Sequence, residues 1–128
     1  MPDAELIRKA IMAHAEWKTR LQKAIETGKV DVSVAKARSA TDCQLGAWLT
    51  GTDLTAVEKR TDHYQTIKRL HAKFHEEAAR IVQLIMVGQK EAATKSLGLL
   101  GEYSVASAAL TNALAKWEAA GMNESAVR

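Results

Sequence analysis

Apolar residues recur at alternating intervals of four and three along two stretches of the sequence, and this periodicity constrains the fold more than any other feature. The first stripe lies within residues 4–27 and the second within residues 55–87. The first comprises Ile7, Ile11, His14, Leu21 and Ile25 and is broken by Lys18, beside which Trp17 can cover the gap; the second comprises Ile67, His71, Phe74, Ala78, Ile81 and Ile85. Such spacing keeps residues on one face of an α-helix. We therefore predict two long amphipathic helices, each with histidine on its apolar face.

A third apolar face lies within residues 89–119 and predicts another helix. Gly98 and Gly101 fall in its middle, where we expect them to allow close packing of a neighbouring helix. The tail, residues 120–128, is predicted to be frayed.

The ends of the first two helices carry recognisable signals. Asp3 is the expected N-cap of the first helix, and Gly28 and Gly88 are expected to end the first and second. Between residues 29 and 54 the periodicity fades, and this segment is predicted to be a loop. A short helix is expected within it, beside Cys43.

These elements predict an all-α fold, an antiparallel up-and-down four-helix bundle in which a short extra helix or loop carries Cys43. The chain has 128 residues, which suits one domain spanning residues 1–128 with a core of about residues 4–119. A single proline and abundant Ala, Leu, Lys and Glu favour helix.

Composition argues against two classes of partner. The net charge is +3 and the basic residues are scattered among acidic ones, whereas nucleic-acid binders usually carry a basic cluster. No stretch approaches the ~20 apolar residues that cross a bilayer. Charges in the first ten residues argue against a signal peptide. We expect a cytoplasmic protein that neither binds nucleic acid nor inserts into a membrane.

Three of the four histidines are candidate metal ligands. His71 and His75 lie one helical turn apart, so their imidazoles can converge on one ion; the alternative is two ordinary helix histidines. His14 lies in the middle of a helix, on its apolar face. It can be a metal ligand, a core residue whose hydrogen bonds are satisfied, or a phosphotransfer histidine. His63 is expected at the surface.

Cys43 is the only cysteine, so no intrachain disulfide is possible. It is expected to begin a short helix, with Thr41 or Asp42 as the cap, and a helix N-terminus favours the metal-binding thiolate. Gly46 would permit close backbone approach, and Trp48 would anchor the segment in the bundle. The alternative is a small buried apolar residue.

The three candidate histidines and the cysteine together form a His3Cys set, which is the number and type of ligands in a closed tetrahedral zinc site. A di-iron centre is disfavoured because no acidic residue lies three positions before His14, His71 or His75. Nothing in the sequence indicates the cleft and oxyanion hole of a hydrolase.

The motifs His14-x-x-Trp17-Lys18, Cys43-x-x-Gly46-x-Trp48-Leu49 and His71-x-x-Phe74-His75 occur in that order. This pattern resembles the chemoreceptor zinc-binding (CZB) domain of bacteria, over about residues 7–117. The resemblance implies a four-helix bundle that binds one zinc ion per chain. The implied ligands are His14, Cys43, His71 and His75, with Trp17, Gly46, Trp48 and Phe74 packed near the site.

The resemblance also implies a function. Family members are non-catalytic regulatory sensors on cytosolic chemoreceptors and diguanylate cyclases, in chemotaxis or cyclic-di-GMP control, and cyclase-linked members form homodimers. Some respond to zinc, and others respond to oxidants such as hypochlorous acid through the zinc-bound cysteine. The alternative is a structural or protein-interaction module in which zinc only braces the bundle.

The chain departs from the family pattern at Met12 and Ala13, because many members carry an acidic residue one or two positions before the first histidine. Asp42 and Glu76 are candidate groups for orienting a ligand histidine. The alternative is that both are solvated surface charges.

Overall fold

The structure is a computed structural model that describes residues 4–39, 43–52 and 54–127. Its helices are α1 (Ala4–Thr27), α2 (Val34–Arg38), α3 (Gln44–Thr50), the 3-10 turn η1 (Glu58–Arg60), α4 (Asp62–Met86), α5 (Lys90–Leu97) and α6 (Glu102–Val127). The described residues contain no strand, and the predicted all-α class is confirmed. Three residues weighed as caps or site residues, Asp3, Thr41 and Asp42, lie outside the described residues.

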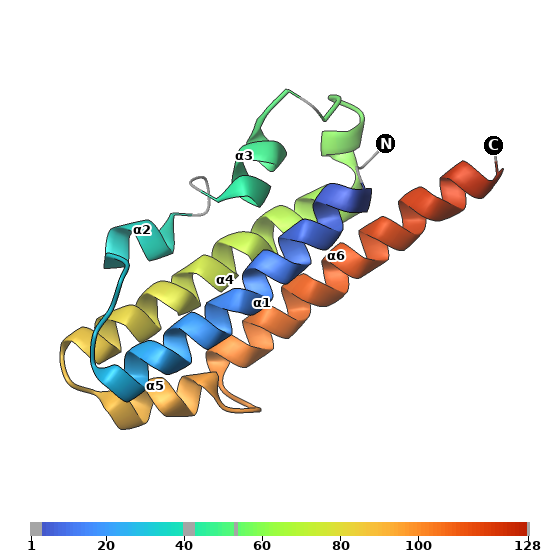
Figure 1. Ribbon diagram of the computed structural model, residues 1–128. Helices are drawn as coiled ribbons and strands as arrows, with labels where there is room; N and C mark the ends of the chain where they lie inside the picture. Colours follow the sequence, from blue (N-terminus) through green and yellow to red (C-terminus); the bar gives the residue numbers. More distant parts are fainter. Residues whose placement is uncertain (1–3, 40–42, 53, 128) are drawn as a thin grey trace.

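Three long helices, α1, α4 and α6, lie side by side along the molecule (Figure 1). An ion pair joins Arg8, near the start of α1, to Glu118, late in α6. Another joins Arg80, late in α4, to Glu102 at the start of α6. Helix α6 is thus antiparallel to both α1 and α4, while α1 and α4 run in the same direction. The predicted antiparallel four-helix arrangement is not confirmed.

The parallel pair follows from the long connection between α1 and α4. Helix α1 has 24 residues and is therefore roughly 36 Å long. We call residues 28–61 the crossover segment; its described parts, residues 28–39, 43–52 and 54–61, lie along the bundle (Figure 1), and α4 begins at the same end as α1. A tight turn at Gly28 would instead have made the two helices antiparallel.

The crossover segment is more regular than predicted. Helix α2 packs on α4, and α3 packs against both α1 and α4. The loop predicted over residues 29–54 is wrong at α2, whose first turn is capped by Ser33: its hydroxyl accepts from the Lys36 N–H at 3.1 Å. Helix α3 is anchored to α6 by the rings of Trp48 and Trp117, whose centroids lie 5.3 Å apart.

Helix α4 ends as predicted but begins later. Gly28 and Gly88 follow α1 and α4 with φ of 72° and 81°, the left-handed conformation in which glycine ends helices. The predicted start near Thr55 is wrong because that residue and Glu58 form their own capping box around η1. The hydroxyl of Thr61 then caps α4.

The single helix predicted over residues 89–119 is two helices, α5 and α6. The break falls at Gly98–Gly101 rather than providing a packing surface within a continuous helix. A Cβ at Gly101 would lie 2.1 Å from the carbonyl oxygen of Ser96, so only glycine fits this turn. Helix α6 runs to Val127, beyond the expected end at Ala119.

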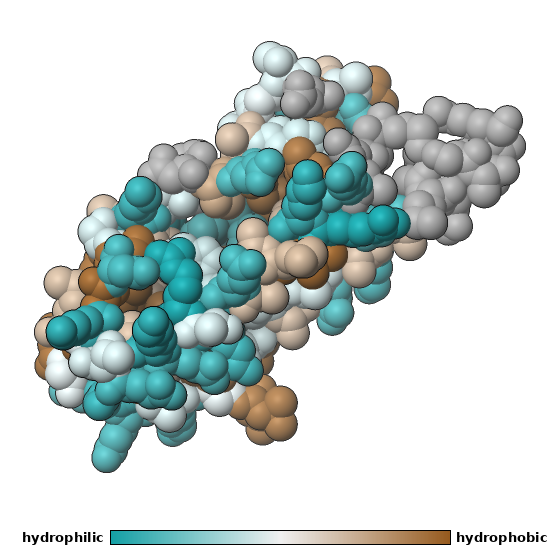
Figure 2. Space-filling model, viewed as in Figure 1, coloured by the Kyte–Doolittle hydropathy of each residue, from teal (hydrophilic) through white to brown (hydrophobic). Residues whose placement is uncertain are grey.

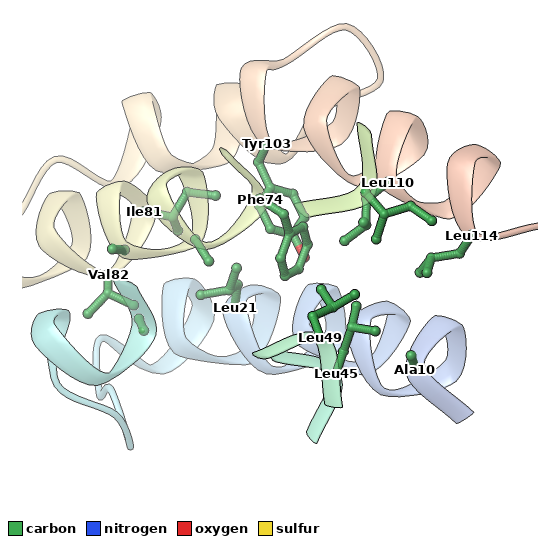
Figure 3. Close-up of a cluster of buried hydrophobic side chains, with 14 of the residues drawn as sticks. Ala10, Leu21, Leu45, Leu49, Phe74, Ile81, Val82, Tyr103, Leu110 and Leu114 are labelled. Atoms are coloured by element: carbon green, nitrogen blue, oxygen red, sulfur yellow. The ribbon is translucent and has the colours of Figure 1, made fainter. Parts of the chain in front are cut away.

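The core fills the space between the long helices and α3 (Figure 3), with Phe74, Tyr103, Leu110 and Leu49 fully or almost fully buried. The viewed face carries mostly hydrophilic side chains with small hydrophobic patches between them (Figure 2). Within the described ranges, no helix combines the length and apolarity needed to cross a membrane.

Candidate metal centre

The candidate ligands come from three elements and meet in the bundle interior. His14 lies on α1, His71 and His75 lie on α4, and Cys43 immediately precedes α3. Each offers one ligand atom, and these four atoms all lie within 4.8 Å of one another. We call this group the His3Cys cluster.

The separations within the His3Cys cluster suit one tetrahedral ion. The Cys43 Sγ is 3.1 Å from the His71 Nε2, which is 3.0 Å from the His75 Nε2. Zinc bonds of about 2.0–2.3 Å would separate neighbouring ligand atoms by roughly 3.3–3.6 Å. These two separations are a few tenths of an ångström shorter than this range.

Backbone carbonyls fix the tautomers of two imidazoles. The Nδ1 atoms of His14 and His75 lie 2.6 Å from the Ala10 oxygen and 2.9 Å from the Ala37 oxygen. A carbonyl oxygen only accepts hydrogen bonds, so each Nδ1 carries the proton and each Nε2 of the neutral ring carries a lone pair. The His14 Nε2 is buried and has no hydrogen-bond partner among the described residues. A buried lone pair without a partner is unfavourable, and a metal ion would satisfy it.

The short helix predicted beside Cys43 is confirmed as α3, but its N-cap residue is Cys43 itself, so the predicted cap, Thr41 or Asp42, is wrong. Its Sγ accepts a hydrogen bond from the Gly46 N–H at 3.4 Å. Hydrogen bonds of this kind, and the positive end of a helix dipole, stabilise a thiolate relative to a thiol. The local structure therefore favours the metal-binding form of the sulfur.

Burial keeps the three imidazoles neutral. His14, His71 and His75 are 4%, 2% and 1% exposed. Desolvation is the largest cause that lowers the pKa of each below the ordinary 6.5. For His71, burial and the neighbouring imidazoles lower the pKa to about 3. At neutral pH the rings hold lone pairs, as metal ligands must.

Aromatic rings pack against the cluster histidines. Phe74 meets the rings of His14 and His75 edge-on, with centroids 4.9 and 5.3 Å apart. Trp17 lies edge-on to His75, with centroids 6.2 Å apart. Gly46 and Trp48 are buried in α3. Of the residues predicted to pack near the site, Trp17, Phe74 and Gly46 contact members of the cluster, whereas Trp48 packs on Trp117 of α6.

Two other predicted residues are not part of the cluster. Glu76 is exposed, and among the described residues it makes no hydrogen bond to any member of the His3Cys cluster. His63 is exposed, as expected. The groups that hydrogen-bond candidate ligand histidines are the carbonyls of Ala10, to His14, and of Ala37, to His75. The first could have been anticipated because it lies four residues before His14 on one helix; no sequence signal indicates the second.

Comparison with known proteins agrees with this geometry. The family model of the chemoreceptor zinc-binding domain matches residues 14–82, more than half of the chain and a span that contains the whole His3Cys cluster. No curated protein and no solved structure matches the chain. The matched family consists of zinc-binding signalling domains, and the His3Cys cluster is positioned for one metal ion. Zinc is the cofactor, and the chain belongs to the chemoreceptor zinc-binding domain family.

Proposed function

We propose that His14, Cys43, His71 and His75 bind one zinc ion and that the chain is a regulatory sensor domain without catalytic activity. The observation that carries this proposal is the convergence of three imidazoles and one sulfur from three elements within 4.8 Å. Four protein ligands would leave no open coordination position for a substrate or a water molecule. When bound, zinc would hold these side chains together and keep the sulfur as a thiolate.

The cluster connects two long helices, α1 and α4, to the crossover segment through two contacts. Cys43 belongs to that segment and supplies the sulfur. The Ala37 carbonyl in α2 accepts the Nδ1–H of His75, so α2 is also tied to a candidate ligand. Metal on one imidazole nitrogen strengthens the hydrogen bond donated by the other. Loss of metal would therefore loosen both α2 and α3 while α1 and α4 stay packed.

Two signals could act on such a connection, the zinc level and a chemical oxidant. The Cys43 thiolate would attack the chlorine atom of hypochlorous acid and release hydroxide, and water would then hydrolyse the sulfenyl chloride to a sulfenic acid, chloride and a proton. The sulfenic acid is a weaker ligand, so oxidation would detach the sulfur. A thiolate ligand is kept reduced in the cytoplasm, the compartment that we propose for the protein.

We propose that the output passes to a signalling protein of chemotaxis or cyclic-di-GMP control, a chemoreceptor or a diguanylate cyclase, and that the chain acts as a homodimer. Support for a protein contact comes from α6, which exposes Val105, Ala108 and Ala115 on its outer side. Small apolar side chains allow a neighbouring helix to approach closely.

Elemental analysis of protein purified without chelator tests the ligand assignment. We expect about one zinc per chain in the wild type and a large loss in Cys43→Ala, because removal of a ligand weakens the site. His63→Ala is the control, since His63 is exposed, and should keep the wild-type zinc content. Equal zinc content in all three proteins would contradict the assignment.

The alternative is a structural or protein-interaction module in which zinc only braces the bundle, and reversibility distinguishes the two. A sensor should release zinc to a chelator well below the unfolding temperature, with faster amide exchange in residues 34–50 and unchanged exchange in α5. A brace should keep its metal until the whole fold melts. Hydrogen exchange with and without zinc therefore separates these functions.

A further inference from the structure

A small pocket opens between α1 and the start of α3, directly beside the His3Cys cluster. Its volume is about 40 Å³. His14 and Cys43 both line it, whereas His71 and His75 do not. The pocket thus reaches His14 and Cys43, the two candidate ligands that do not belong to α4.

The walls of the pocket combine small side chains with one large ring. Ala10 and Ala13 line one side, and Ala13 is exposed. Trp17 is half-buried and lines the same pocket one turn further along α1. The Arg20 guanidinium lies 4.6 Å from the Trp17 ring centroid, and this cation–π contact helps to hold the ring in place.

The size of the pocket limits what passes through it. One water molecule needs roughly 10–15 Å³ of such volume, so a pocket of about 40 Å³ admits a water molecule or a small ion. A chelator or a peptide thiol is far larger. Bound metal is therefore out of direct reach of such molecules by this route.

We propose that this pocket is the passage through which zinc reaches and leaves the His3Cys cluster, and that Ala13 and Trp17 set its width. The proposal rests on the zinc site proposed above. Because a passage is crossed in both directions, a change in its width alters uptake and release by the same factor and leaves the affinity unchanged. Zinc must also leave before a chelator captures it, so the release rate should not depend on chelator concentration.

Stopped-flow measurements with a chromogenic pyridylazo chelator test the width of the passage. Ala13→Leu should slow both zinc uptake and zinc release roughly tenfold, the effect of a barrier raised by about 1.4 kcal/mol. Ala15→Leu is a matched control, because it makes the same change at an exposed position on the same helix outside the pocket. The proposal would be overturned if Ala13→Leu kept the wild-type rates, or if it changed the rate of uptake but not that of release, or the reverse.

Two further measurements extend the test. Trp17→Ala should widen the passage and speed both zinc uptake and zinc release. Circular dichroism of the variant tests whether it keeps its helices. In the wild type, a release rate proportional to chelator concentration would show that the chelator attacks bound zinc directly, which contradicts a narrow passage. Measurements of zinc content distinguish failure of the passage proposal from failure of the ligand assignment. Ala13→Leu should keep the wild-type zinc content. If the ligand assignment were incorrect, Cys43→Ala would hold as much zinc as the wild type.

Discussion

At the scale of single residues, the candidate site depends on buried imidazoles whose orientation is fixed by main-chain carbonyls. Ala10 and Ala37 accept the Nδ1–H groups of His14 and His75, which directs both Nε2 lone pairs into the cluster. The third ring, His71, lies between Cys43 and His75. Three neutral rings buried together are favourable only while they remain unprotonated.

This arrangement predicts the pH dependence of the metal-free protein. The folded pKa of His71 is about 3, below the ordinary 6.5, so protons bind the unfolded chain first and stability falls as pH drops below 6.5. His71 alone should lower the free energy of unfolding by about 1 kcal/mol between about pH 7.5 and about pH 5.5. Denaturant unfolding of the metal-free protein measures this loss.

Two variants identify the groups responsible. His71→Gln removes one of the three buried titrating rings and should reduce the pH dependence without abolishing it, because burial also lowers the pKa of His14 and of His75. The exposed His63→Gln should leave the pH dependence unchanged. A stability that rises as pH falls from about 7.5 to about 5.5 would contradict the account of buried neutral rings.

At the scale of elements, the tight turn between α5 and α6 makes a separate prediction. Gly101→Ala should lower the free energy of unfolding by more than about 1 kcal/mol, because its Cβ would meet the Ser96 carbonyl. Leu99 lies in the same turn and is 92% exposed, so Leu99→Ala should change stability by less than about 0.5 kcal/mol. Thermal or denaturant unfolding compares the two; equal effects would mean that the turn tolerates a side chain.

The same turn shows which features of the fold could be predicted from the sequence and which could not. Periodicity predicted α1, α4 and the common face of His71 and His75, since these features depend on spacing along one helix. The break at Gly101 was missed because it depends on the distance to the Ser96 carbonyl, which exists only in the folded turn. The direction of α4 was missed because a long connection permits either orientation.

The cluster was predictable only in part. The place of His14 on an apolar face follows from periodicity, whereas its meeting with Cys43 depends on the path of the crossover segment. The complement of ligand types indicated that meeting, and the family pattern supported it. The Ala37 carbonyl is a backbone group 38 positions away from His75, and no residue type marks it.

At the scale of the whole molecule, one small cluster joins α1, α4 and the crossover segment, so the metal would stabilise contacts made by most of the chain. Zinc that binds only the folded form raises its stability in proportion to the logarithm of its concentration above the dissociation constant. The connection between metal and fold therefore depends on which atoms hold the ion.

X-ray absorption spectroscopy at the zinc edge tests that assignment most directly. The wild-type protein should show one sulfur neighbour at about 2.3 Å and three nitrogen neighbours at about 2.0–2.1 Å, and Cys43→Ala should lose the sulfur neighbour. His63→Ala should give the wild-type spectrum. A zinc ion surrounded by oxygen and nitrogen, with no sulfur neighbour in the wild type, would contradict the His3Cys site.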